Sequence, residues 1–437
     1  MKKNRSYFYP SVSTSLVLTD MINRTGGQTP QWLTFAKVRA SYASVGNDLA
    51  PYQLYNNYSI GKDPNGNTTA GRENTKNDEN ILSELIKNME VGLETKFFRN
   101  RFGFDLTFYK QNATNQILRI PMNPLSGYQF KRVNAGNIQN SGIELVLNGR
   151  PLDQENGLRW DVMLNFARNK NKIIDLYEDV AVYALGGFDN LSINAVKGGN
   201  YGDIWGYKYR RVEDTKSEHY GKLLLTSTGL PQAATASSHL GNQLPKATIG
   251  FSNTFAYKDF TFSFLFDARI GGEIFSATNL YLQNAGLAAV TAPNGQRNKF
   301  VVEGVTIDPN NPNPDSEGKY QYVVNSKEVE VQEYWKAVQS GGATFNLGIN
   351  EENVYDATNI RLRNIALNYS IPQRILKNSV VKRAKVGFSV NNVWMVKSYM
   401  NGIDPESVFA TGTNAVGFEF FAPPTGRSYF LNLLFGF

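Results

Sequence analysis

Hydrophobic and polar residues alternate with period two over much of the chain. Successive side chains of a β-strand point to opposite faces, so this alternation predicts strands with one apolar and one polar face. Residues 260–270 place four phenylalanines on one face and Asp267 and Arg269 on the other. Such two-faced strands favour a wall between lipid and water over a sandwich core. The predicted strands are 7–18, 33–43, 89–98, 102–110, 142–148, 158–168, 205–212, 248–257, 260–270, 359–371, 384–393 and 428–437.

The connections alternate in length. Short turns are predicted at 98–101, 148–157, 257–260 and 372–383, and long polar stretches at 47–83, 111–141, 271–355 and 397–426. Bacterial barrels place short turns in the periplasm and long loops outside. For the turns at 98–101 and 257–260 to lie on the same side, either 220–227 is a further strand returning from 205–212, or 205–212 does not span. We favour the first, which predicts roughly thirteen strands, within a range of 12–14.

The last strand has an apolar face that continues to the final residue. Its side chains are Tyr429, Leu431, Leu433, Phe435 and Phe437, and the opposite face is less uniformly apolar. An apolar edge strand in water invites aggregation, whereas a membrane barrel places aromatic residues at the lipid boundary. We therefore predict an all-β, antiparallel transmembrane β-barrel in the cell outer membrane. These five residues are assigned to the strand that the barrel-assembly machinery engages.

Composition excludes several classes of protein. No run of about 18 apolar residues occurs, which excludes a helical membrane protein. The net charge of +7 comes from dispersed Lys and Arg, so we expect no nucleic-acid partner and a preference for anionic outer-membrane lipid. The chain has no cysteine and no nucleophile, zinc or phosphate-loop motif, and we expect no cofactor, no metal and no enzymatic activity.

Several segments, in order, resemble those of the SusC/RagA-type TonB-linked outer-membrane transporters of Bacteroidetes. Each is a weak strand motif alone, but together they cover nearly the whole chain. The segments are 35–47 (FAKVRASYASVGN), 133–145 (VNAGNIQNSGIEL), 165–172 (NFARNKNK), 244–259 (LPKATIGFSNTFAYKD), 360–372 (IRLRNIALNYSIP), 390–393 (VNNV), 402–406 (GIDPE) and 426–429 (GRSY).

The resemblance implies a TonB-dependent receptor barrel of about 22 strands. Residues 1–437 would be its C-terminal portion, a fragment without plug or signal peptide, that reaches the TonB complex through the missing N-terminal part. It also implies uptake of a nutrient, an oligosaccharide or a peptide, together with a SusD-like lipoprotein. Aromatic residues of outer loops can stack on such cargo, and the alternative for each is loop packing. The candidates are Tyr55, Tyr58, Tyr128, Tyr281, Tyr334 and Trp335.

One rival interpretation is a secreted or surface β-sheet carbohydrate-binding protein without transport. It predicts short loops at both ends of the sheet and two faces of the same character. Asp404 and Glu406 lie two residues apart, but catalytic carboxylates of glycosidases must flank a bound sugar. The pair resembles a turn of the transporter family, and we interpret it as such.

Overall fold

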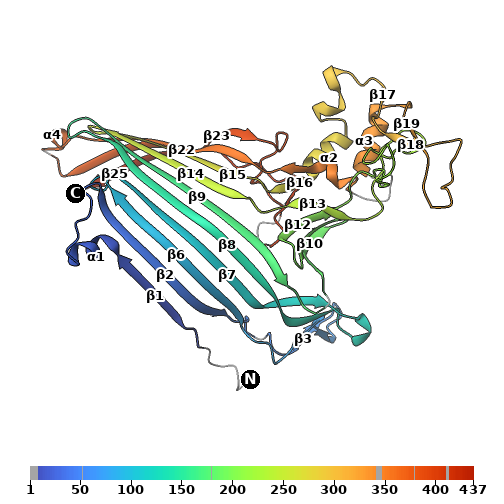
Figure 1. The fold of residues 1–437 in the computed structure, drawn as a ribbon, viewed down its shortest axis with the longest axis horizontal. Coiled ribbons are helices and arrows are strands. Elements are labelled where there is room, and N and C mark those ends of the chain that lie inside the picture. The colour runs from blue at the N-terminus through green and yellow to red at the C-terminus, as the bar shows by residue number, and fades with distance from the viewer. Residues whose placement is uncertain (1–7, 52, 179, 341–346, 378, 410–412) are drawn as a thin grey trace.

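Eleven long strands form one antiparallel sheet whose order follows the chain (Figure 1). The structure is a computed structural model and describes residues 8–51, 53–178, 180–340, 347–377, 379–409 and 413–437. The two-residue strand β5 (Thr75–Lys76) pairs with β8 and brings this sheet to twelve strands. The long strands are β1 (Ser11–Val17), β2 (Leu33–Asn47), β6 (Glu84–Phe97), β7 (Phe102–Pro121), β8 (Phe130–Asp153), β9 (Leu158–Asp175), β14 (Ala247–Tyr257), β15 (Phe260–Ile270), β22 (Asn359–Ser370), β23 (Arg383–Ser398) and β25 (Ser428–Gly436).

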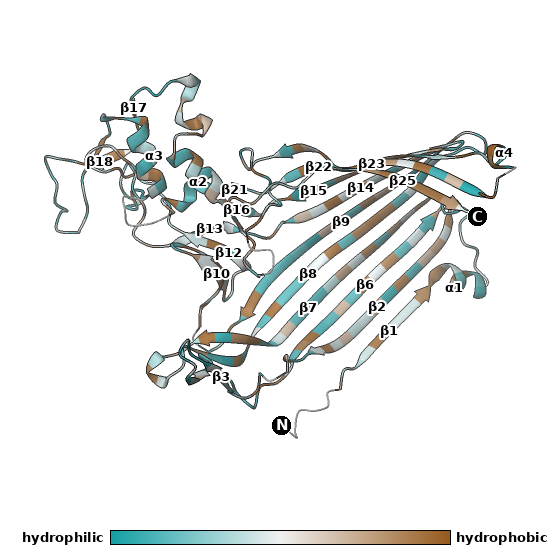
Figure 2. Ribbon diagram, turned by 180° about the vertical axis from the view of Figure 1, so that it is seen from behind, coloured by the Kyte–Doolittle hydropathy of each residue, from teal (hydrophilic) through white to brown (hydrophobic). Residues whose placement is uncertain are grey.

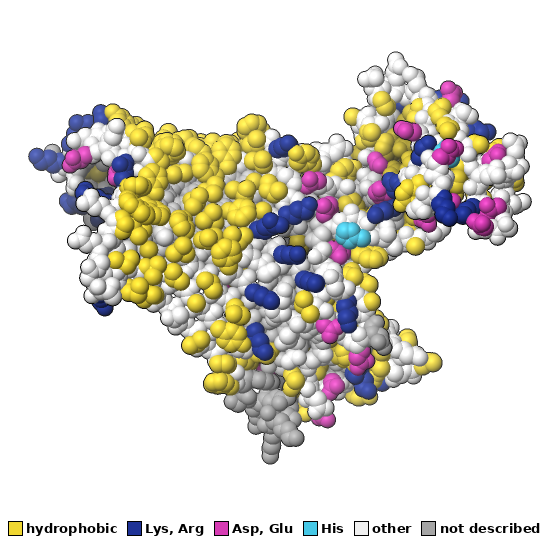
Figure 3. All heavy atoms as spheres, viewed as in Figure 1, with side chains coloured by type: hydrophobic (Ala, Val, Ile, Leu, Met, Phe, Trp, Pro, Cys, Tyr) yellow, Lys and Arg dark blue, Asp and Glu magenta, His cyan; other side chains and the backbone are white. Residues whose placement is uncertain are grey.

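One face of this sheet is apolar and exposed. Trp160, Phe255, Phe262 and Leu367 are successive partners on β9, β14, β15 and β22, and the indole stacks on Phe255 with ring centroids 5.5 Å apart. Leu367 stays 48% exposed because no protein layer covers this face. The same row continues through Phe388 and Leu431. Such a face is stable only against lipid, and Figure 3 shows it as a band of hydrophobic side chains.

The other face is polar. Asn165, Gly250 and Asp267 are partners on β9, β14 and β15, one position away from the apolar row of Phe166, Ile249 and Ala268. The alternation is visible along the strands in Figure 2. A one-residue shift in register would exchange the two faces, so the pattern specifies the pairing. We call this polar face the lumenal face.

Eleven of the twelve predicted period-two segments form the long strands, and two predictions are wrong. Residues 205–212 do not cross the sheet, because β12 (Tyr201–Gly206) pairs only within a separate four-stranded sheet. Residues 220–227 form isolated bridges instead of a returning strand. Both segments belong to a folded lobe, where local alternation packs a small core rather than a membrane wall.

The predicted polar loop at 111–141 is also wrong. β7 and β8 continue as a paired hairpin up to Pro121 and Phe130, joined by the short turn around Pro124–Ser126. Asn112, Gln139 and Asn137 hydrogen-bond to one another across the strands. Many polar residues at 111–116 and 137–141 suggested a loop, whereas Ile120, Val133 and Ala135 form a small buried cluster in the outer part of the hairpin.

A lobe covers the long-loop end of the sheet, opposite the short turns and α4 (Gln373–Leu376) (Figure 1). Its largest core contains Leu191, Ile193, Ile204, Phe275 and Leu280, all at most 2% exposed. We call it the outer lobe, since long loops face outward in bacterial barrels. Its elements are β10 (Val182–Phe188), β11 (Leu191–Val196), β12, β13 (Ser238–Asn242), β16 (Glu273–Ser276), α2 (Ala277–Asn284), β17 (Phe300–Val301), β18 (Val305–Ile307), β19 (Tyr322–Val324), β20 (Glu328–Val329), α3 (Val331–Ser340), β21 (Val354–Asp356) and β24 (Phe418–Glu419).

Three small elements lie outside the sheet and the outer lobe. They are α1 (Leu18–Arg24), which links β1 to β2, and the hairpin of β3 (Tyr58–Lys62) and β4 (Thr68–Arg72). Among the described residues, none of the helices has the length and apolar character needed to cross a membrane.

The predicted C-terminal strand is confirmed as β25. Tyr429, Leu431 and Leu433 pair with Val390, Phe388 and Val386 of β23 and share their apolar face. They are 57–69% exposed, because β25 is an edge of the sheet. The other edge is β1, which pairs only with β2 among the described strands.

Candidate functional site at the junction of wall and outer lobe

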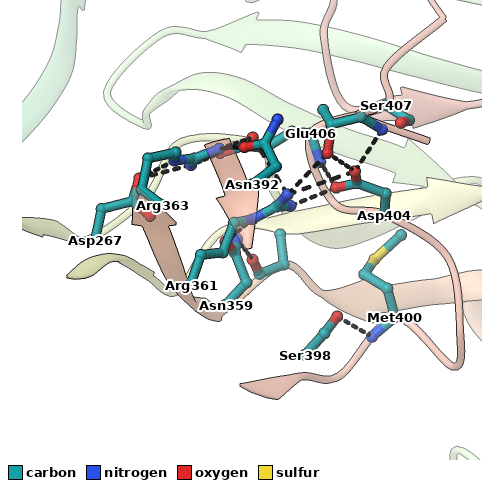
Figure 4. Close-up of polar contacts among 12 residues, drawn as sticks. Asp267, Asn359, Arg361, Arg363, Asn392, Ser398, Met400, Asp404, Glu406 and Ser407 are labelled. Carbon is teal, nitrogen blue, oxygen red and sulfur yellow. Dashed lines mark hydrogen bonds and ion pairs between the residues drawn. The ribbon is translucent and has the colours of Figure 1, made fainter. Parts of the chain in front are cut away.

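Two arginines of β22 bind the loop residues Asp404 and Glu406 and fasten this part of the loop to the barrel wall (Figure 4). The Arg361 guanidinium forms an ion pair with both oxygens of Asp404. Arg363 donates to both oxygens of Glu406, at 2.6 and 2.9 Å, and to Asp267 Oδ2 of β15 at 2.6 Å. We call these five residues the clasp, because they join the wall to the loop across 43 residues of sequence and β15 to β22 across 96.

A β-bulge directs Arg363 into the clasp. Leu362 pairs with Phe266 and Asn364 with Leu265, so Arg363 has no partner position and projects to the lumenal face beside Arg361. On the other side Asn392 adopts a left-handed φ of 51°, a conformation that asparagine tolerates well. Its side-chain oxygen accepts from Arg363 at 3.1 Å. Bulges commonly reorient a side chain in this way.

The clasp is protected from solvent at its centre. The Arg361 and Asp404 side chains are 4% and 7% exposed. Burial acts to raise the pKa of Asp404, but hydrogen bonds from Arg361 and Thr425 outweigh it and hold that pKa below its usual range. Burial opposes ionisation of Glu406 as well, and Arg363 keeps its pKa below the usual range. Both carboxylates therefore stay ionised at neutral pH and are engaged by arginine.

A groove of about 380 Å³ runs along the lumenal face next to the clasp, and Asn165 and Asp267 are among the residues that line it. Small residues form its floor, since Ala167 and Gly250 leave the backbone open. Glu144, Asp267 and Arg269 supply charged groups at its rim. Beyond it, the Tyr109 hydroxyl donates to Asn169, and Asn169 and Asn171 both donate to Asn140. Such amides and charges can hydrogen-bond the hydroxyl or peptide groups of an extended cargo.

An aromatic cluster lies on the outer lobe above β16 and α2. Phe420 contacts Tyr281, Phe409 and Phe421 at ring-centroid distances of 6.0, 5.7 and 5.3 Å. Tyr281, Phe409 and Phe421 keep 41%, 58% and 57% of their surface exposed. We call these three residues the aromatic edge. Planar exposed rings held by packing can stack on sugars or accept apolar side chains.

Three of the predicted loop aromatics lie apart from the clasp and the aromatic edge. Tyr55 and Tyr58 are exposed in the segment between β2 and β6. The Tyr128 ring lies under the Arg72 guanidinium, 4.3 Å from its centroid. Their role in cargo binding stays a prediction.

Tyr334 and Trp335 on α3 lie inside the outer lobe. Trp335 is 7% exposed and packs with Val331 and Val338, which corresponds to the packing alternative. The Tyr334 ring contacts Phe300 and Trp335 edge-on, at 5.2 Å in each case. Burial raises the pKa of the Tyr334 hydroxyl. Of the six candidates, Tyr281 alone belongs to the aromatic edge.

Sequence reasoning missed most of the site. The clasp has a local signal: the apolar positions 360 and 362 are even and 365, 367 and 369 are odd, so the alternation changes phase at Arg363. A phase change inside a strand indicates a bulge. Phe418, Phe420 and Phe421 stand out as aromatics in a stretch assigned to a polar loop.

Fold and site together define the class: a transmembrane β-barrel wall of the outer membrane, with an apolar outer face, a polar lumenal face and a fastened outer lobe. The sequence profile described as "TonB dependent receptor-like, beta-barrel" matches residues 2–393. The chain belongs to this family of TonB-dependent receptors. The family is one of receptors and transporters rather than enzymes, and the predicted outer-membrane location is confirmed.

Curated relatives in Formosa agariphila match over nearly the whole chain. TonB-dependent receptor P3 is 25% identical over 99% of this chain and 42% of its own length. TonB-dependent receptor P26 is 25% identical over 95% of this chain and 40% of its own length. The chain therefore spans less than half the length of these relatives.

Solved structures agree on the fold. The structure of the RagAB peptide transporter superposes with a TM-score of 0.70 at 18% identity, covering 100% of this chain and 44% of that one. The "closed-closed" state of the RagAB peptide importer gives 0.69 at 18% identity over 99% of this chain. The resemblance seen in the sequence is confirmed at the level of the family and the fold.

Proposed function

We propose that this chain forms the C-terminal part of a TonB-dependent barrel that takes up a nutrient, an oligosaccharide or a peptide. The observation that carries the proposal is the two-faced wall, with apolar rows outside and polar positions such as Asn165 and Asp267 inside, in a chain of the receptor family. Uptake needs no covalent chemistry by these residues. They bind cargo at the outer lobe and provide the wetted wall along which it passes.

Residues 1–437 are proposed to be a single, incomplete barrel domain. Its edges β1 and β25 each have one paired side among the described strands, and lipid does not tolerate unpaired backbone groups. Further strands of a longer protein would close the barrel, and its plug would connect cargo release to the TonB complex. The barrel-assembly machinery would engage β25.

The aromatic edge supports a role in cargo capture with a SusD-like lipoprotein as lid. Tyr281 and Phe421 are held by Phe420, with ring centroids of Tyr281 and Phe421 5.4 Å apart, so the platform is rigid as well as exposed. Rigid aromatics contribute contact area at a small entropic cost. The rival carbohydrate-binding sheet is not favoured, because the loops are long at one end only and the two faces differ.

The test is uptake in the source bacterium, with the gene in its natural coding context. Deletion is expected to abolish TonB-dependent growth on one class of sole nutrient, either oligosaccharides or peptides. Unchanged growth on every member of both classes would refute the proposal.

Variants of the receptor that restore growth of the deletion strain then test the aromatic edge, by their affinity for the cargo. The double variant Tyr281→Ala/Phe421→Ala is expected to lower cargo affinity by about 10-fold or more, because stacked aromatics are worth about 1 kcal/mol each beyond their buried area. Tyr220→Ala is the control, since Tyr220 is 58% exposed on the same lobe but outside the aromatic edge. Equal effects of the two changes would exclude a specific role for the edge.

A further inference from the structure

Five basic side chains lie in a compact group on the outer face of the wall, where its apolar band ends toward the outer lobe. They all occupy outward positions, in the same register set as the apolar rows. We call them the basic belt. The residues are Lys87 of β6, Lys110 of β7, and Arg168, Lys170 and Lys172 of β9. Figure 3 shows Lys and Arg side chains along this border of the hydrophobic band.

The register places the belt directly above the apolar rows. One row across β6 to β9 consists of Met89, Lys110, Ser141 and Lys170. The next row toward the outer lobe consists of Lys87, Asn112, Gln139 and Lys172. The row on the membrane side is Val91, Phe108, Ile143 and Arg168. The outer face therefore changes from apolar to basic within two rows, about 13 Å along a strand.

Charge on these four strands is separated by face. The outward positions of β6 to β9 from the apolar rows up to the belt include no Asp or Glu. Asp175, at the outer end of β9, pairs with Asn137 and forms an ion pair with Lys197. The lumenal positions of these strands hold Glu84, Glu90, Glu94, Asp105, Glu144, Asp153 and Asp161. All five belt residues are exposed, and within the described part of the chain none of them forms an ion pair. A solubilising surface would mix both signs, so the excess of one sign at one depth calls for an anionic partner.

We propose that the basic belt binds phosphorylated headgroups of lipids in the outer leaflet of the membrane. Long basic side chains beside an apolar surface extend toward the interface and meet phosphate at that depth. Lys110 and Lys170 lie on strands two intervals apart, about 10 Å, with the Ser141 hydroxyl between them. A phosphate over Ser141 is within reach of both ammonium groups. The lipid chains would cover Phe108, Ile143 and the apolar rows below.

This site is independent of cargo uptake and rests only on the outer-membrane location of the wall. It faces away from the lumenal groove, because the belt and Glu144 or Asn165 occupy alternate positions of the same strands. Loss of lipid binding is therefore separable from loss of transport. A negative result in the cargo assay would not contradict lipid binding by the belt, and a negative result in the lipid assay would not contradict cargo uptake.

The experiment measures lipid binding to the full receptor purified in a neutral detergent. Native mass spectrometry compares monophosphoryl lipid A with the same lipid after removal of its phosphate. The wild type is expected to bind the phosphorylated form at least about 10-fold more tightly, since each basic residue near an anionic surface contributes about 5-fold before screening. The preference is expected to shrink as ionic strength rises.

The belt variant is K110Q/R168Q/K170Q/K172Q, and it is expected to bind both forms equally. The control variant R374Q/K377Q/K382Q/R383Q removes the same charge from exposed positions at the short-turn end. It is expected to keep the wild-type preference. Heat-modifiable migration in gels shows whether each barrel is folded.

Three results would overturn the proposal. The wild type binds both lipid forms equally, the belt variant keeps the preference, or inorganic phosphate displaces the lipid completely and thereby identifies a site for the free ion. The first comparison uses the wild type alone, so the proposal stays testable if the belt variant does not fold.

Discussion

Breaking the clasp at Arg361 is expected to loosen the loop around Asp404 and Thr425 from the wall, while the sheet and the pairing of β24 with β16 stay intact. Arg361→Met removes the guanidinium and keeps most of the side-chain volume. Asp404 is then left buried and ionised without its cation, with hydrogen bonds from Thr425 N, Thr425 Oγ1 and Glu406 N as its remaining support. The change therefore acts on the part of the loop around Asp404, while Arg363 still binds Glu406 and β24 stays paired with β16.

The magnitude follows from burial. Removing one partner of a buried ion pair costs about 3–5 kcal/mol, and the surviving backbone donors place this case near the lower end. About 3 kcal/mol corresponds to roughly a 100-fold increase in the opening of the loop. The matched control is Lys197→Met, because the pair of Lys197 with Asp175 is 47% and 56% exposed and an exposed pair contributes about 0–1 kcal/mol.

Hydrogen exchange measures this opening amide by amide. We expect roughly 100-fold faster exchange at Glu406 and Thr425 in Arg361→Met, no change in β23 or β25, and little effect of Lys197→Met. Unchanged exchange at Glu406 and Thr425 would refute the reasoning, and so would equal acceleration across the whole sheet.

The pH dependence of the clasp has a definite sign. The pKa of Asp404 is depressed in the folded state, so its contribution is complete above the usual aspartate pKa of about 3.9 and is lost as pH falls below it. The clasp is therefore expected to stay closed from neutral pH down to about pH 4.

Two further predictions concern the wall and the outer lobe. Phe251→Arg on the apolar face is expected to destabilise the barrel by about 2–4 kcal/mol, measured by denaturant unfolding from lipid vesicles. The control Ser252→Arg on the lumenal face is expected to cost much less. Equal losses of stability would contradict the assignment of the two faces. Burial raises the pKa of Glu352, although the Tyr209 hydroxyl donates to it at 2.8 Å. Because the pKa of Glu352 is raised in the folded state, its contribution to stability falls as pH rises above the usual glutamate pKa of about 4.3. The protection of α3 amides against hydrogen exchange is therefore expected to decrease from there toward neutral pH. Glu352→Gln is expected to flatten this profile, and a profile identical to the wild type would show that Glu352 does not control it.

The sequence by itself determined the wall. All eleven long strands and the apolar face of β25 follow from period-two patterning, because the side-chain direction in a strand is a local property. The long loop predicted at 111–141 does not form, because β7 and β8 continue as a hairpin there. The pattern also restricts the register, since a shift by one residue would turn the apolar rows to the lumen. The same alternation wrongly predicted membrane strands at 205–212 and 220–227, where the apolar residues pack into a small core of the outer lobe.

Tertiary structure decided where the functional residues meet. Arg363 reaches Asp267 and Glu406 from 96 and 43 residues away, and only the bulge and the pairing of β15 with β22 bring them together. Tyr281 joins Phe421 in the same way, and the five residues of the basic belt form a group only once β6 to β9 are in register. Pattern specifies which face a side chain takes, because that depends on its neighbours in the chain. Which charges become partners depends on distances in space, and those are set by the packing of segments far apart in sequence.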